Sequence, residues 1–152
     1  METVFNPLLW LFLSYALGVL ATEGLKMTGA YEQLADRHVL SDDLTRRLGV
    51  LHLGRLIRHT FLRRFNPRLQ YAGGFRRAEL QQLKADMTYA EVNHLLGFFL
   101  FAGFIIWLAV RGIAAWQIAG YALVNVVFNG YLVLLQQYNK RRIGRILDRR
   151  PA

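Results

Sequence analysis

The sequence contains no cysteine. Its absence excludes disulfide bonds, thiolate catalysis, and any zinc or iron–sulfur site built on cysteine ligands. The sequence also lacks a phosphate-binding glycine loop and a dinucleotide fingerprint, and the order of its residues suggests no Ser-His-Asp arrangement. Because all of these motifs are absent, the general catalytic motifs do not indicate which reaction the protein catalyses.

Acidic residues are few, because 10 Asp and Glu stand against 19 Lys and Arg, for a formal net charge of +9. The basic residues lie beside apolar segments, and no nucleic-acid-binding motif accompanies them. We therefore expect no nucleic acid as a partner. Anionic membrane lipids or a phosphorylated cosubstrate are the expected counterions.

Hydrophobic residues make up 54% of the 152 residues, and most of them lie in three long runs, at about 5–22, 89–110 and 114–137. This pattern predicts an all-α integral membrane protein with three transmembrane helices in a single membrane domain, residues 1–152. The first run has no basic segment before it and no clean cleavage site after it. We interpret it as a retained transmembrane helix.

The stretch between the first two runs is polar and strongly basic. Leucines recur at helical spacing among arginines between residues 41 and 65, and Ser41 offers a helix start, which predicts a basic amphipathic helix in the head-group plane. A shorter helix is expected from about Arg76 into Met87. Most Lys and Arg fall in the loop 23–88 and the tail 140–150, whereas Arg111 alone lies between the second and third runs. We therefore expect a multi-pass protein of the cell membrane with loop and tail in the cytoplasm.

The third run carries four carboxamides, which at about 100° per residue fall in a narrow stripe on one helical face: Asn125, Asn129, Gln136 and Asn139. Unsatisfied amides are costly in hydrocarbon, so the stripe predicts a buried polar seam or a water-lined site. The connection 111–113 is short enough to force an antiparallel hairpin. The hairpin would bring Glu91 and His94 level with residues 136–142.

Glu91 and His94 are three residues apart and share a helical face, so the carboxylate can orient the imidazole as a general base. A structural hydrogen bond at the membrane boundary is the alternative. A Glu-x-x-His pair also supplies metal ligands in helical bundles, but the third helix adds only amides, so we expect no metal site.

Asn129 lies in the apolar middle of its helix, where its amide can stabilise an oxyanion, hold a substrate, or join two helices. Tyr138 falls roughly opposite the amide stripe, where an interfacial anchor is its simplest role. The charge run Lys140, Arg141 and Arg142 suits phosphate binding and serves equally as a positive-inside signal.

The second half of the chain resembles the glycosyl-4,4'-diaponeurosporenoate acyltransferase family of carotenoid biosynthesis. The resemblance rests on Ala90-Glu91-Val92-Asn93-His94, on Asn129, and on Gln136-Gln137-Tyr138-Asn139-Lys140-Arg141-Arg142. Gly74-Phe75-Arg76-Arg77 is similar to an upstream element of the family, whereas Leu95 replaces an aromatic residue that follows the motif histidine there.

The resemblance implies transfer of a fatty acyl group from acyl-CoA, a cosubstrate and not a bound cofactor, to a sugar hydroxyl of a glycosylated lipid. Under this hypothesis His94 removes the hydroxyl proton, Glu91 orients His94, Asn129 or Gln136 stabilises the oxyanion, and Arg141 or Arg142 binds phosphates. The expected substrate-binding residues are Asn125, Tyr138, Asn139, Lys140, Arg141 and Arg142.

The competing interpretation is a non-catalytic small membrane subunit whose polar seam binds a lipid or the helix of a partner. Three helices leave little room to enclose two substrates, so both interpretations leave open a homo-oligomer or a membrane partner. Convergence of Glu91, His94, Asn129 and Gln136 on a cavity open to the cytosol and the lipid would favour an enzyme, whereas tight packing with mutually satisfied side chains would favour the subunit.

Overall fold

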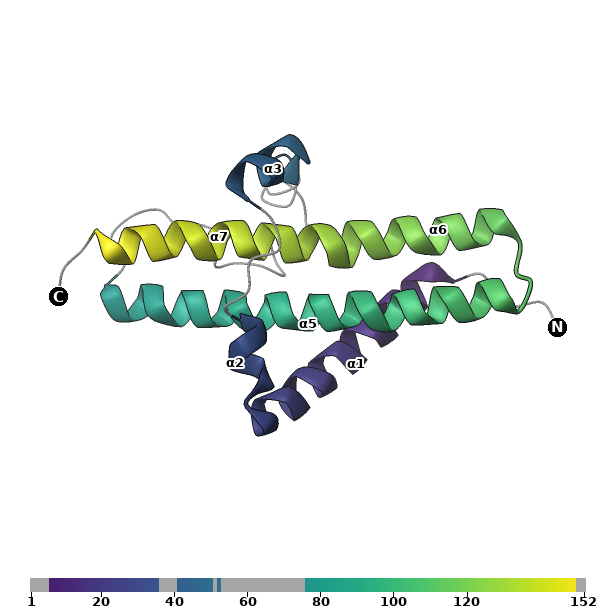
Figure 1. Cartoon of the computed structure of the whole chain (residues 1–152), viewed down its shortest axis with the longest axis horizontal. Coiled ribbons are helices and arrows are strands. Elements are labelled where there is room, and N and C mark those ends of the chain that lie inside the picture. Colours follow the sequence, from purple (N-terminus) through teal and green to yellow (C-terminus); the bar gives the residue numbers. More distant parts are fainter. Residues whose placement is uncertain (1–5, 36–40, 51, 53–75, 150–152) are drawn as a thin grey trace. The chain divides into compact units, whose positions relative to one another are not determined.

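The computed structural model describes residues 6–35, 41–50, 52 and 76–149, and every regular element in this part of the chain is a helix. Figure 1 shows these helices. In chain order they are α1 (Pro7–Thr28), α2 (Ala30–Ala35), α3 (Asp42–Arg47), α5 (Arg77–Val110), α6 (Ala115–Asn125), the π-helical turn η3 (Val126–Gly130) and α7 (Tyr131–Asp148). The chain divides into two compact units, residues 1–37 with 91–133 and residues 38–90 with 134–152.

In the first unit, the second half of α5 and α6 form the predicted antiparallel hairpin. The turn between them uses Gly112 at φ +75°, a left-handed conformation that glycine adopts without steric cost, and the amide of Ile113 donates to the carbonyl of Leu108 at 3.2 Å. Phe101, Leu108 and Tyr121 form the buried apolar cluster between the helices. The hairpin is confirmed.

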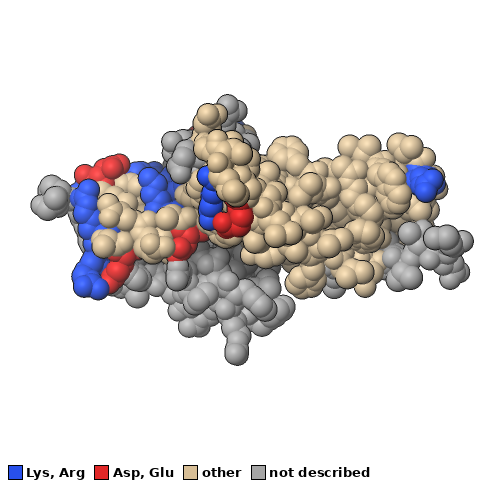
Figure 2. All heavy atoms as spheres, turned by 90° about the horizontal axis from the view of Figure 1, so that it is seen from below, with Lys and Arg blue, Asp and Glu red and all other residues tan. Residues whose placement is uncertain are grey.

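Two stretches of helix among the described residues are long and apolar enough to cross a membrane: Arg77–Val110 and Ala115–Asp148. They correspond to the second and third predicted spans, but each helix extends beyond its apolar run. Arg111 is the one charged residue between Asn93 and Asn139, and Figure 2 shows the uncharged surface over the hairpin with a basic patch at its tip. The first predicted span, residues 5–22, stays a prediction.

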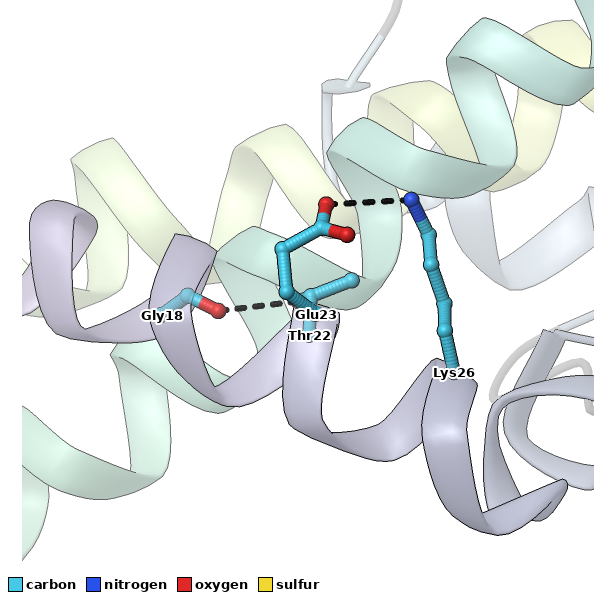
Figure 3. A network of polar contacts seen from close by, with 4 residues as sticks. All are labelled: Gly18, Thr22, Glu23 and Lys26. Carbon is cyan, nitrogen blue, oxygen red and sulfur yellow. Dashed lines mark hydrogen bonds and ion pairs between the residues drawn. The ribbon is translucent and has the colours of Figure 1, made fainter.

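Helix α1 begins at a capping side chain, because Asn6 Oδ1 accepts a hydrogen bond from the amide of Leu9 at 3.0 Å. The helix ends at Gly29, which has φ +72°. Figure 3 shows two polar contacts within this helix: Thr22 Oγ1 donates to the carbonyl of Gly18 at 2.9 Å, and Lys26 pairs with Glu23 at 3.0 Å. Thr22 therefore satisfies its hydroxyl within its own helix, despite being buried.

In the second unit, the start of α5 packs against the end of α7. Leu80, Leu83 and Met87 from α5 form a buried cluster with Ile143 from α7. This packing explains why both helices continue past their apolar runs, since each has an amphipathic extension whose apolar side is covered.

Helix α3 also belongs to the second unit, and Ser41 caps it as predicted: the Ser41 hydroxyl accepts from the amide of Leu44 at 3.3 Å. The rest of the predicted basic amphipathic helix, residues 53–65, lies outside the described residues.

Candidate functional site

His94 lies on α5 within the first unit, where it meets a residue from the π-helical turn. Its Nδ1 atom is 3.2 Å from Oδ1 of Asn129, which follows it by 35 residues in the sequence. The structure thus brings together two residues that the sequence indicated separately. The hairpin was expected to bring His94 level with residues 136–142, but the hydrogen bond of His94 is with Asn129.

Asn129 continues the contact into a chain of hydrogen bonds. Its Nδ2 donates to Oδ1 of Asn125 at 2.9 Å, and Nδ2 of Asn125 donates to the backbone carbonyl of Phe98 at 3.0 Å. The two asparagines are buried, with 2% and 1% of their surfaces exposed at positions 125 and 129. We call these four linked groups, His94, Asn129, Asn125 and the Phe98 carbonyl, the amide relay.

The amide relay fixes the direction of every hydrogen bond in it. A backbone carbonyl only accepts, so Asn125 must present its NH₂ group to Phe98 and its oxygen to Asn129. Asn129 then presents its own oxygen to His94, and Nδ1 of His94 must carry the proton. In the neutral imidazole, Nε2 is therefore the nitrogen with the free lone pair. The geometry prepares Nε2 as a proton acceptor.

The π-helical turn Val126–Gly130 contains Asn129 and interrupts an otherwise α-helical stretch. Turns of this kind inside helices occur frequently at functional sites. A π-helix has more residues per turn than the assumed α-helix, so the single straight stripe of four carboxamides is not kept through this segment. Downstream of η3 the buried positions include Gln137 and Lys140, whereas Asn139 is half-buried.

Glu91 lies one turn before His94 on α5 and is buried. The predicted role of Glu91 was to orient the imidazole. In the structure Asn129 provides the contact at Nδ1, and the role of Glu91 stays a prediction. Asn93, between the two, is also buried, and its Oδ1 has no hydrogen-bond partner among the described residues.

The remaining predicted residues lie on α7 in the second unit. Gln136 and Lys140 are buried, Tyr138, Asn139 and Arg141 are half-buried, and Arg142 is exposed. Arg141 donates through its guanidinium to Thr45 Oγ1 of α3 at 3.3 Å, a contact that sequence spacing does not predict. Two buried atoms, Gln136 Oε1 and Asn139 Nδ2, have no hydrogen-bond partner in the described part of the chain.

Within the described ranges, no group of three or more His, Asp or Glu side chains lies together in a way that would hold a metal ion.

The family model of glycosyl-4,4'-diaponeurosporenoate acyltransferase matches residues 33–149. The chain belongs to this family. The matched region contains the whole amide relay and every predicted site residue, whereas all of α1 precedes it. No curated protein and no solved structure was found to match the chain. The protein is thus an acyltransferase, and membership of the diaponeurosporenoate acyltransferase family favours the enzyme over the non-catalytic subunit.

Proposed function

We propose that this acyltransferase moves a fatty acyl group from acyl-CoA to a hydroxyl group of a glycosylated lipid, with His94 as the general base. The observation that carries the proposal is the amide relay, which leaves Nε2 of His94 as an acceptor. An imidazole with one fixed N–H and one free lone pair is the usual group for activating a hydroxyl.

The proposed reaction proceeds in two steps. Nε2 of His94 takes the proton of the acceptor hydroxyl while the oxygen attacks the thioester carbonyl, forming the C–O bond and a tetrahedral oxyanion. The oxyanion then collapses, the C–S bond breaks, and His94 returns the proton to the thiolate of coenzyme A. The products are an ester and free coenzyme A, so His94 is restored.

Asn129 acts in this scheme as the residue that positions His94. Its oxygen contacts Nδ1 of His94 and its NH₂ group donates to Asn125, so both ends of the amide are engaged. An asparagine serves the same purpose beside the histidine of some cysteine proteases. The oxyanion role proposed for Gln136 and the phosphate-binding role proposed for Arg141 and Arg142 stay predictions.

We further propose that the enzyme is a multi-pass protein of the cell membrane, with α1 as a third span and the reaction at the cytoplasmic boundary. Support for α1 comes from its exposed apolar side chains, which include Leu9, Phe12 and Leu20. Support for the orientation comes from the tail, where residues 140–150 carry six Lys and Arg against one acidic residue.

The proposal is tested by transfer of label. Protein in lipid vesicles is incubated with a radiolabelled long-chain acyl-CoA and extracted membrane glycolipids. We expect label in a lipid product with the parent protein and with His52→Ala, and none with His94→Ala. His52 is the matched control, since its side chain is exposed. Turnover by a folded His94→Ala variant would show that His94 is not the general base. If the parent protein transfers no label to any lipid in the extract, the proposed substrates are wrong.

A further inference from the structure

Helix α1 makes backbone contact with α5 at the part of α5 that carries His94. A Cβ atom added to Gly18 would lie 2.5 Å from the carbonyl oxygen of Asn93, and one added to Gly97 would lie 3.2 Å from the carbonyl oxygen of Ser14. The Gly97 position also lies 3.4 Å from Oδ1 of Asn129. Glycines at these two positions let the helices touch, so the register of α1 along α5 is fixed beside the amide relay.

Tyr15 is the residue that this register brings to the histidine. The ring centroids of Tyr15 and His94 are 5.5 Å apart and the rings are inclined by 45°. The neighbouring hydroxyl of Ser14 donates to the carbonyl of Leu11, within its own helix. Among the described residues, the contact that α1 makes with the imidazole is the aromatic ring of Tyr15.

One hydrogen bond does not hold an imidazole in a single orientation, because the terminal torsion of histidine has a broad energy profile. Asn129 restrains Nδ1, but the ring can still swing about that contact and move Nε2. An aromatic ring packed against the imidazole blocks part of this swing. Tyr15 is still 44% exposed, so it restrains His94 without enclosing it.

We propose that Tyr15 is a positioning residue for His94, and that α1, which precedes the region matched by the family model, is therefore part of the active site. The inference rests on the proposed function, in which His94 is the base. Asn129 and Tyr15 then restrain one imidazole from two different helices.

The test compares Tyr15→Ala and Tyr15→Phe with Phe12→Ala, a control aromatic on the same helix that is 71% exposed. Each protein is assayed in vesicles with acyl-CoA and dodecyl glucoside as the acceptor probe. We expect kcat of Tyr15→Ala to fall about tenfold, with both KM values within about twofold, because a displaced base slows the chemical step and not binding. Tyr15→Phe should restore most of the loss, and Phe12→Ala should behave as the parent.

An independent measurement follows the imidazole itself. In protein with ¹⁵N-labelled histidine, the His94 signals, assigned by their absence in His94→Ala, should broaden or split in Tyr15→Ala and be restored in Tyr15→Phe. Unchanged signals and kcat in Tyr15→Ala would overturn the inference, as would an equal loss in Phe12→Ala. If the parent shows no transfer, the proposed function fails, and the imidazole spectra alone decide the role of Tyr15.

Discussion

Nδ1 of His94 and Oδ1 of Asn129 lie 3.2 Å apart. The side chain of Asn125 links this pair to a backbone carbonyl, because it accepts a hydrogen bond from Asn129 and donates one to the carbonyl of Phe98. The carbonyl is the fixed end of the sequence of contacts, since it cannot donate. The protonation pattern of the histidine is thereby decided by a peptide group on its own helix, Phe98, one turn further along α5.

The first prediction concerns the contact itself. Asn129→Ala removes the acceptor at Nδ1, so the imidazole loses its preferred tautomer and orientation, and we expect kcat to fall on the order of 10²-fold. Steady-state kinetics with the purified enzyme measure the loss. Asn129→Asp keeps an oxygen at Nδ1 and should lose less than Asn129→Ala; equal activity of Asn129→Ala and parent would show that the contact is only structural.

The second prediction concerns Asn125, which touches the histidine through Asn129 alone. Asn125→Leu removes the group that fixes the direction of the Asn129 amide, so that amide can turn its NH₂ group toward Nδ1. We expect a mixture of the two neutral tautomers of His94 and roughly tenfold lower kcat. The ¹⁵N shifts of the imidazole nitrogens report the tautomer directly. Gln117→Leu, which alters an amide on the same helix α6 outside the relay, should leave the tautomer unchanged.

The third prediction uses two glycines of α1. Gly18→Ala places a methyl group 2.5 Å from the backbone oxygen of Asn93, a contact that no side-chain movement relieves, so α1 must shift and the melting temperature should fall. Gly24→Ala meets nothing within 4 Å and should raise stability by about 0.5–1 kcal/mol through helix propensity. Thermal unfolding in one detergent compares them. A Gly18→Ala protein as stable as Gly24→Ala would contradict the close approach.

The fourth prediction concerns phosphate recognition by Arg141, whose guanidinium is held by Thr45. Arg141→Gln should raise KM for acyl-CoA about tenfold, as expected for a lost charge-assisted contact. KM for an acyl-pantetheine, which has no phosphate, should not change. Lys84→Gln alters an exposed basic residue of the same unit and should leave both KM values unchanged. An equal rise for both donors in Arg141→Gln would indicate a structural role.

The fifth prediction concerns orientation and uses the absence of cysteine, which makes any introduced thiol unique. A cysteine replacing Arg111 at the hairpin should react with a membrane-impermeant maleimide on intact cells. One replacing Arg149 should react only after the cells are permeabilised, because the basic tail is expected in the cytoplasm. The reverse labelling pattern would invert the proposed topology.

The long apolar runs and the short connection 111–113 were sufficient to predict the hairpin, and polar residues within or beside these runs singled out His94 and Asn129 as candidates. The contact between His94 and Asn129 was not predictable. It depends on a π-helical turn at residues 126–130, and no residue type in this segment indicates such a turn. The approach of Tyr15 to His94 was missed for a different reason. It depends on Gly18, and a glycine in an apolar run gives no sign of which helix lies against it.

Under the proposed function and topology, the length of α5 would set the depth at which the reaction takes place in the membrane. His94 precedes Val110, the last residue of this helix, by 16 positions, which at 1.5 Å per residue is about 24 Å of helix. A hydrocarbon core is about 30 Å thick, so a helix with Val110 near the outer boundary would hold the imidazole just inside the inner one. The helix length would then select the hydroxyl that reacts. A hydroxyl at that depth, close to where the sugar of the lipid joins its apolar chain, would be esterified. More distant hydroxyls of the same sugar would not reach His94.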